Sequence, residues 1–280
     1  MRHDGVINAD AEPRPFTLEG HAGTLAGSCW PAAEARAVVL IAHGYGEHVR
    51  RYDHVAARLN RAGLSVYAAD HAGHGRSDGE RVLIPDFEPV VEDVQRVLEH
   101  AARENPGLPL VLIGHSMGGM IAARFAQVHG EELTALVLSG PVLGRWETVE
   151  QLLTVEVIPD DPIDVSTLSR DPEVGRRYEA DPLIWHGPFR RPTLQGLHDA
   201  MDRINATGSI GEIPLLYLHG EADPLVPIED SLGGLEKIRG PRTEVTTYPG
   251  ARHEIFNETN QAEVLDDVVA FVDRLLADAE

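Results

Sequence analysis

The segment Gly114–Gly119, which reads Gly-His-Ser-Met-Gly-Gly, places a serine where a buried strand must turn abruptly into a helix. The apolar run Leu110–Ile113 precedes it and the amphipathic stretch Met117–Ala126 follows it. In this strand-turn-helix context the pattern is typical of a nucleophile elbow, where glycines two residues on either side of the serine remove side chains that would collide. We therefore expect Ser116 to be a nucleophile held on a strained turn.

Short apolar runs alternate with amphipathic stretches along most of the chain. Strands are predicted at residues 37–42, 64–69, 109–113, 133–139, 214–220 and 243–248, helices at 52–62, 87–104, 231–238 and 261–278, and an opening hairpin within 17–30. Because each strand is apolar almost throughout, the sequence predicts an α/β fold with a mainly parallel sheet covered by helices on both faces. Residues 1–15 are polar and contain two prolines, so a loose leader is expected there.

The alternation stops at Pro141 and resumes at Pro214, and the residues between them are rich in proline and lack a strand-like run. Such an interruption indicates an insertion between two strands of one sheet. We expect a core formed by residues 1–141 and 212–280, with a mainly helical cap inserted at residues 142–211 over the active edge of the sheet.

Charge and cysteine content narrow the classes of partner and site. The chain has 45 acidic and 24 basic residues, for a formal net charge of −21, which opposes binding to nucleic-acid phosphates. Cys29 is the single cysteine, so internal disulfides and cysteine-based metal sites are excluded. No apolar run approaches the roughly 20 residues that span a bilayer, and the first residues lack a secretory signal. We expect a cytoplasmic protein without a nucleic-acid partner.

A serine hydroxyl needs a base to take its proton and an acid to orient that base. In folds built around a nucleophile elbow, the order along the chain is serine, acid, histidine. His253 follows the strand predicted at 243–248 and precedes the last helix, so its loop can return the imidazole to the carboxyl edge of the sheet. Asp223, which follows the strand at 214–220, is the candidate acid, and Glu221 is the alternative.

Attack on a carbonyl creates an oxyanion that needs preorganised hydrogen-bond donors. The backbone N–H of Met117, directly after the nucleophile, is one expected donor. The second should come from the loop after an earlier strand, and the glycine-lined turn His43–Gly46 can direct the Tyr45 N–H inward.

Several motifs, taken together, resemble those of the monoacylglycerol lipases of the α/β-hydrolase superfamily, and most closely those of the bacterial branch. The motifs are His43–His48 with Arg51 and Tyr52, Asp70–Ser77, Gly114–Gly119, Ser169–Val174, Asp181–Leu183, and His253 with Asn257 and Glu258.

The resemblance implies an α/β-hydrolase fold and a serine hydrolase that releases a fatty acid and glycerol from monoacylglycerol without a cofactor. It also implies that Tyr45 and Met117 supply the oxyanion hole and that Glu47 and Arg51 receive the glycerol end of the substrate. Phe256 stands where the vertebrate pattern has a histidine.

Other functions use the same residue types. A general carboxylesterase, a lysophospholipase or an aminopeptidase of this fold would need the same serine, acid and histidine. A non-catalytic ligand-binding protein of this fold is an alternative of a different class, although it would not need the complete set.

Apolar residues of the cap, among them Trp185, Phe189, Leu197, Met201 and Ile204, either line an acyl channel or bury one another. We expect the cap to make transient contact with a membrane or micelle, because an exposed apolar patch would give access to lipid esters.

Overall fold

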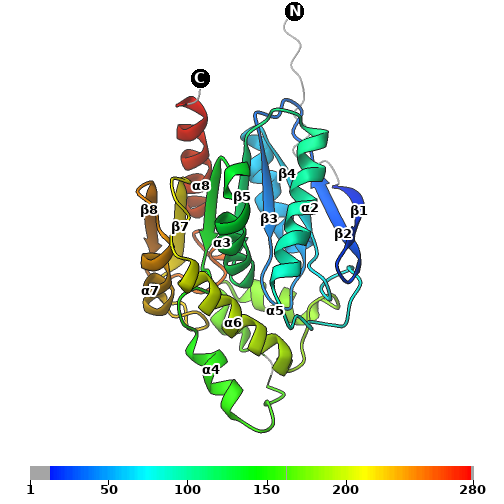
Figure 1. Cartoon of the computed structure of the whole chain (residues 1–280), viewed down its shortest axis with the longest axis vertical. Coiled ribbons are helices and arrows are strands. Elements are labelled where there is room, and N and C mark those ends of the chain that lie inside the picture. The colour runs from blue at the N-terminus through cyan, green and yellow to red at the C-terminus, as the bar shows by residue number, and fades with distance from the viewer. Residues whose placement is uncertain (1–12, 162, 279–280) are drawn as a thin grey trace, which may run out of the picture.

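The computed structural model describes residues 13–161 and 163–278. Its sheet has eight strands in the order β1-β2-β4-β3-β5-β6-β7-β8, as Figure 1 shows. The pairs β1·β2 and β2·β4 are antiparallel, and all other neighbours are parallel. The strands are β1 (Arg14–Gly20), β2 (Gly23–Trp30), β3 (Ala37–Ala42), β4 (Leu64–Ala69), β5 (Leu110–His115), β6 (Ala135–Ser139), β7 (Leu215–Gly220) and β8 (Thr243–Tyr248).

Helices of two kinds connect the strands. The α-helices are α1 (Asp53–Arg61), α2 (Glu88–Glu104), α3 (Met117–His129), α4 (Glu147–Thr154), α5 (Pro172–Ala180), α6 (Arg191–Thr207), α7 (Ile228–Ile238) and α8 (Gln261–Ala277). The 3-10 turns are η1 (Val49–Tyr52), η2 (Gly130–Glu132), η3 (Val165–Thr167) and η4 (Ile255–Asn257).

Helices cover both faces of the sheet because successive side chains of each strand point to opposite sides. Leu40 of β3 and Leu112 of β5 belong to the core that α2, α3 and α6 cover. Their neighbours Val39 and Val111 belong to the second core, beneath α1 and α8. In Figure 1, α2 and α3 lie in front of the sheet and α8 lies behind it. The predicted parallel sheet with two covered faces is confirmed.

The opening hairpin is confirmed but begins at Arg14 rather than at Thr17. Pro15 therefore belongs to β1, although the sequence predicts a leader over residues 1–15. Proline is tolerated here because β1 is an edge strand that pairs with β2 alone, and an edge strand can leave one N–H position without a ladder bond. Residues 1–12 of the predicted leader lie outside the described residues.

Between β6 and β7 the chain forms α4, α5 and α6 and, among the described residues of 142–211, no strand. Figure 1 shows α4 and α6 at the end of the molecule opposite the two termini. Helix α6 packs against α3, and its residues Leu197, Met201 and Ile204 are buried in the core that α2 and α3 share. These three residues therefore belong to the core, and none of them lines the cavity at the end of β5.

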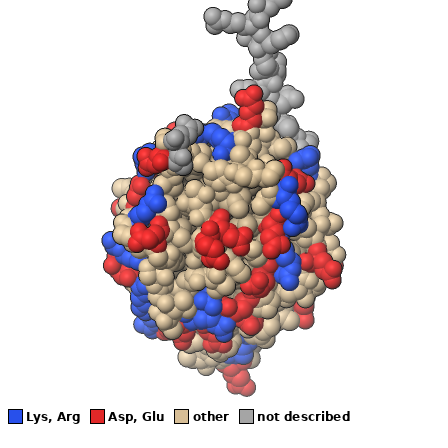
Figure 2. Space-filling model, turned by 45° about the horizontal axis from the view of Figure 1, so that its top comes forward, with Lys and Arg blue, Asp and Glu red and all other residues tan. Residues whose placement is uncertain are grey.

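Charged groups of both signs are interspersed on the surface. Figure 2 shows the molecule tilted so that the end carrying the two termini comes forward, and acidic and basic side chains alternate there with uncharged surface. Within the described part of the chain, no helix has the length and apolar character needed to cross a bilayer.

Helix α3 begins in close contact with β3. A Cβ added to Gly118 would lie 2.1 Å from the Ala42 carbonyl oxygen, well inside van der Waals contact. By contrast, a Cβ on Gly233, an exposed glycine inside α7, would meet nothing within 4 Å.

We predict that Gly118→Ala lowers the free energy of unfolding by about 1–3 kcal/mol, because the helix must move away from the sheet. The matched variant Gly233→Ala should raise it by about 0.5–1 kcal/mol, since alanine has the better helix propensity. Urea denaturation followed by circular dichroism measures both. Equal effects of the two substitutions would contradict the close packing of α3 on β3.

Candidate active site

Ser116 occupies a strained turn between β5 and α3. Its backbone has φ +55° and ψ −120°, a conformation that residues with a side chain rarely adopt. The Ser116 N–H donates to the Ser139 carbonyl (3.0 Å), and the N–H groups of Gly119 and Met120 donate to the Ser116 carbonyl. A Cβ on Gly114 would lie 2.3 Å from the Gly118 carbonyl oxygen. The predicted need for small residues around the serine is confirmed.

His253 and Asp223 meet Ser116 at the carboxyl edge of the sheet. The Ser116 hydroxyl lies 2.9 Å from His253 Nε2, and His253 Nδ1 lies 2.7 Å from Asp223 Oδ2. The second carboxylate oxygen of Asp223 accepts the N–H groups of Leu225 (2.9 Å) and Val226 (3.0 Å). The alternative acid, Glu221, accepts instead from the Thr247 hydroxyl at the surface.

The electrostatics of this group favour a charged aspartate beside an imidazole that readily gains a proton. Burial opposes the charge on Asp223, but His253 and His219 outweigh it and hold the pKa of Asp223 well below its usual range. Burial also opposes the charge on His253. The Asp223 carboxylate outweighs that effect and raises the pKa of His253 above its ordinary value of 6.5. In this arrangement His253 Nδ1 donates its hydrogen to Asp223 and Nε2 is free to accept from Ser116.

The loop that contains Tyr45 lies directly over the serine. A Cβ on Gly44 would lie 3.2 Å from the Ser116 Cβ, so a larger residue there would make a tight contact with the serine. Neither the Tyr45 N–H nor the Met117 N–H has a hydrogen-bond acceptor among the described residues. Both donors predicted for the oxyanion hole thus have no acceptor in the part of the chain that the structure describes.

His43 orients the peptide that carries the Tyr45 N–H. Its Nε2 accepts the N–H of His71 (2.9 Å), so its hydrogen is on Nδ1, which donates to the Gly44 carbonyl (2.8 Å). The carbonyl and N–H of one peptide unit point in opposite directions, so fixing the Gly44 carbonyl also fixes the Tyr45 N–H. Burial, together with the neighbouring His71 and His74, keeps the pKa of His43 well below its usual range.

Glu47 and Arg51 line the cavity at the serine, but they bond to other protein groups. Glu47 Oε1 accepts the Gly44 N–H (2.6 Å) and the Tyr52 hydroxyl (2.7 Å), and its Oε2 accepts from Arg51 (2.6 Å). Arg51 also forms a two-pronged ion pair with Glu254. Sequence reasoning missed Glu254, although its position directly after the predicted catalytic histidine is a signal that could have found it.

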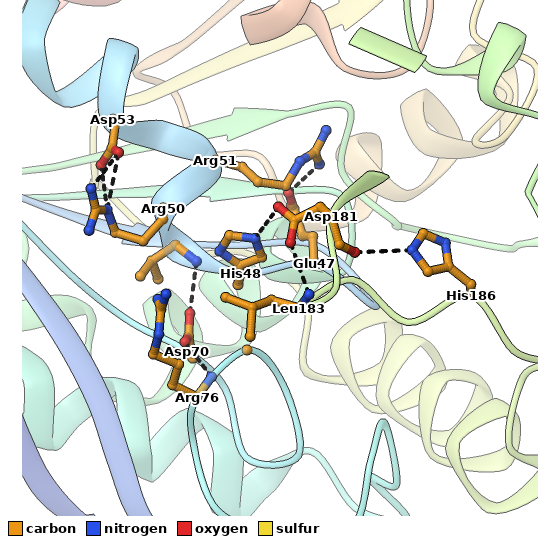
Figure 3. Close-up of polar contacts among 12 residues, drawn as sticks. Glu47, His48, Arg50, Arg51, Asp53, Asp70, Arg76, Asp181, Leu183 and His186 are labelled. Atoms are coloured by element: carbon orange, nitrogen blue, oxygen red, sulfur yellow. Dashed lines mark hydrogen bonds and ion pairs between the residues drawn. The ribbon is translucent and has the colours of Figure 1, made fainter. Parts of the chain in front are cut away.

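The segment around Asp181, between α5 and α6, holds the same loop from the other side. His48 Nε2 lies 2.8 Å from Asp181 Oδ2, and the Trp185 N–H donates to the Gly46 carbonyl (2.7 Å). The rings of Tyr45 and Phe189 stack with centroids 4.5 Å apart. Figure 3 shows His48 directed at Asp181 beside the Glu47–Arg51 pair. The His48–Asp181 pair spans a long stretch of chain, so local sequence patterns do not predict it.

A cavity of about 120 Å³ opens at Ser116 and His253. Its apolar wall comes largely from Trp146, Ile163, Leu168, Tyr178, Phe189 and Leu225. A wall of this apolar character suits an acyl chain, and the polar side chains of Glu47, Arg51 and Glu254 line the same cavity. Within residues 13–161 and 163–278, no cluster of three or more histidine, cysteine or acidic side chains has the geometry to hold a metal ion.

Known proteins resemble this chain over most of its length. The model of the serine aminopeptidase S33 family matches residues 33–260. Monoacylglycerol lipase of Mycolicibacterium smegmatis is 38% identical over 86% of this chain and 90% of the relative. Monoglyceride lipase of Homo sapiens is 34% identical over 81% of this chain and 78% of the relative. The crystal structure of a monoacylglycerol lipase from Paleococcus ferrophilus is 28% identical, with a TM-score of 0.77, over 90% of this chain and 98% of that chain.

The strain at Ser116 predicts that two substitutions of this residue differ in stability. Both Ser116→Ala and Ser116→Gly remove the hydroxyl, but only glycine adopts a φ of +55° without cost. We expect the free energy of unfolding of Ser116→Gly to exceed that of Ser116→Ala by about 1–3 kcal/mol. Urea denaturation of the two variants measures this difference. A glycine variant no more stable than the alanine variant would show that the turn is not strained.

Proposed function

Because the chain belongs to the serine aminopeptidase S33 family and is similar over most of its length to monoacylglycerol lipases, we propose that it is a serine hydrolase that cleaves monoacylglycerols into a free fatty acid and glycerol. The observation that supports this proposal most directly is the continuous series of hydrogen bonds from Asp223 through His253 to Ser116. Ser116 also lines a largely apolar cavity.

The proposed cycle starts with attack of Ser116 Oγ on the ester carbonyl while His253 Nε2 takes the hydroxyl proton. Asp223 accepts the Nδ1 hydrogen throughout and stabilises the imidazolium. The N–H groups of Tyr45 and Met117 donate to the oxyanion of the tetrahedral intermediate. His253 then gives its proton to the departing glycerol oxygen, which leaves the fatty acyl group on Ser116.

Water completes the reaction. His253 Nε2 takes a proton from the water that attacks the acyl carbonyl, and the same two N–H groups hold the second oxyanion. Collapse of that intermediate breaks the bond to Ser116 Oγ, which recovers its proton from His253. The products are a fatty acid and the free enzyme. The imidazole that moves the protons lies within hydrogen-bond distance of both Ser116 and Asp223.

We propose that residues 142–211 form a cap over a catalytic core made of residues 1–141 and 212–280. Trp146, Leu168 and Phe189 of this segment contribute to the cavity wall, which would hold the acyl chain. Val157, after α4, leaves 79% of its surface exposed. We infer that this end of the cap makes transient contact with a membrane or micelle when it collects substrate.

The glycerol end of the substrate is proposed to reach Glu47 and Arg51, because both line the cavity beside Ser116. Since both already bond to protein groups, glycerol would use the N–H groups that remain free on the guanidinium. A cytoplasmic location is also proposed. Cys29 is buried as a free thiol, which fits a reducing compartment.

A fluorophosphonate probe and a substrate panel test the proposed function. We expect stoichiometric labelling of the purified protein, none in Ser116→Ala, and turnover of monoacylglycerols above that of simple esters, lysophospholipids and peptide amides. Failure of the folded wild-type protein to label would favour a non-catalytic binding protein. Labelling with turnover of peptides alone would retain the nucleophile and reject the lipase.

The raised pKa of His253 sets the direction of the pH dependence. His253 must be neutral to accept the Ser116 proton, so kcat/KM should rise with pH through an ionisation above 6.5. Asp223→Asn removes the group that raises this pKa, so its ionisation should move to lower pH while kcat falls by about 10⁴-fold. A wild-type profile that is flat between about pH 5 and pH 8 would contradict this.

A further inference from the structure

A buried carboxylate next to the triad histidine has no part in the cycle described above. Glu254 follows His253 directly and lies on the wall of the same cavity, with only 5% of its surface exposed. Burial opposes its charge, but Arg51 outweighs burial and lowers the pKa of Glu254 to about 2. A fully charged group is therefore held out of water beside the reacting atoms.

Glu254 is the first member of a chain of contacts that ends at residues 43–47. We call this segment, which carries the Tyr45 N–H, the oxyanion loop. Arg51 Nη2 donates to Glu254 Oε2 (2.7 Å) and Arg51 Nη1 donates to Glu254 Oε1 (2.8 Å). The same Nη1 group donates to Glu47 Oε2 (2.6 Å). Glu47 Oε1 then accepts the N–H of Gly44 (2.6 Å), the residue that packs over Ser116.

This series of contacts joins two segments that are not connected by strand pairing. One is the loop after β8 that carries His253, and the other is the loop after β3 that carries Tyr45. Asn257 braces the first end by donating to Glu254 Oε2 (2.8 Å), and Tyr52 braces the second by donating to Glu47. The base and the oxyanion donor are therefore tied to each other through Arg51.

Stability alone does not account for such an arrangement. Taking charges out of water costs several kcal/mol for each ion, and a buried ion pair often adds no net stability relative to apolar residues of similar volume. What a two-pronged guanidinium-carboxylate pair does supply is a fixed geometry. A shift of about 1 Å in a catalytic group can cost a factor of about 10² in rate, so geometry is valuable at this position.

We propose that Glu254 is a positioning residue that, through Arg51 and Glu47, holds the oxyanion loop at a fixed distance from the triad histidine. This inference rests on the proposed function and assigns to Glu47 and Arg51 a task beyond contact with glycerol. Glu254 itself neither touches the substrate carbonyl nor transfers a proton.

Glu254 also contributes to the electrostatics of His253. The charged and titratable groups that face this imidazole are Asp223, His115, Glu254 and Glu47. After the effect of Asp223, the negative charge on Glu254 raises the pKa of His253 further. Neutralising Glu254 therefore gives a second readout, because the pH dependence of the reaction must change along with its rate.

The chain offers a matched control in Glu258. This carboxylate is also buried, lies on the same loop and forms an ion pair with an arginine, Arg170 (2.9 Å). Its two oxygens also accept the backbone N–H groups of Arg170, Arg252 and Thr259, and none of these hydrogen bonds involves residues 43–47. Replacing either glutamate by glutamine keeps its shape and removes one buried charge.

The test compares Glu254→Gln and Glu258→Gln with the wild-type enzyme. We expect Glu254→Gln to lower kcat by about 10- to 100-fold with KM changed less than about threefold, and to move the ionisation in kcat/KM to lower pH. Glu258→Gln should lose thermal stability but keep kcat within about threefold. Equal kcat losses in the two variants, or a Glu254→Gln enzyme with wild-type kcat, would overturn the proposal.

A second variant and a structural comparison complete the test. If Glu254→Gln does not fold, Arg51→Lys replaces it, because lysine keeps the charge but lacks the two-pronged donor. The same kcat loss is then expected, and wild-type kcat would overturn the proposal.

If the wild-type protein hydrolyses no ester, the proposed function fails. Crystal structures of the wild-type protein and of Glu254→Gln then test whether Glu254 positions the oxyanion loop. Displacement of residues 43–47 in Glu254→Gln supports it, and an unchanged loop overturns it.

Discussion

The hydrogen bond between the Ser116 hydroxyl and His253 Nε2 is the contact that needs the whole fold to form. The serine comes from the end of β5 and the histidine from the loop after β8, so the 2.9 Å contact exists only when the sheet is complete between them. Parallel pairing brings the carboxyl ends of these strands to one edge. The glycines around Ser116 allow the strained turn that exposes its hydroxyl there.

Around this contact, the molecule uses buried polar groups mainly to fix backbone atoms. His43 holds the Gly44 carbonyl, Glu47 holds the Gly44 N–H, and Trp185 donates to the Gly46 carbonyl. Each bond restricts the short loop that carries the Tyr45 N–H. Oxyanion stabilisation depends on donors that are already in place before the charge develops. Trp185, which lies between α5 and α6, and the buried side chains of His43 and Glu47 therefore all restrict the same loop.

Much of this arrangement follows from local sequence patterns. The apolar runs identify β3 and β4 at their observed residues, and the chain order of the elbow fold selects Asp223 and His253 from many acids and histidines. What local patterns miss is pairing between distant residues. The ion pair from Arg51 to Glu254 and the contact of His48 with Asp181 depend on the tertiary fold. The burial of Ile204 on α6 beneath α3 has the same origin, because helical periodicity does not say which partner an apolar face meets.

We propose that Ser116, His253 and the backbone N–H groups of Tyr45 and Met117 act on one carbonyl. A crystal structure of the covalent adduct with an alkyl fluorophosphonate tests it most directly. We expect phosphorus bonded to Ser116 Oγ, its free oxygen about 2.7–3.1 Å from the nitrogens of both Tyr45 and Met117, and the alkyl chain along Trp146 and Phe189. An adduct on another residue would show that Ser116 is not the nucleophile, and a phosphonyl oxygen that points away from both N–H groups would show that they do not form an oxyanion hole.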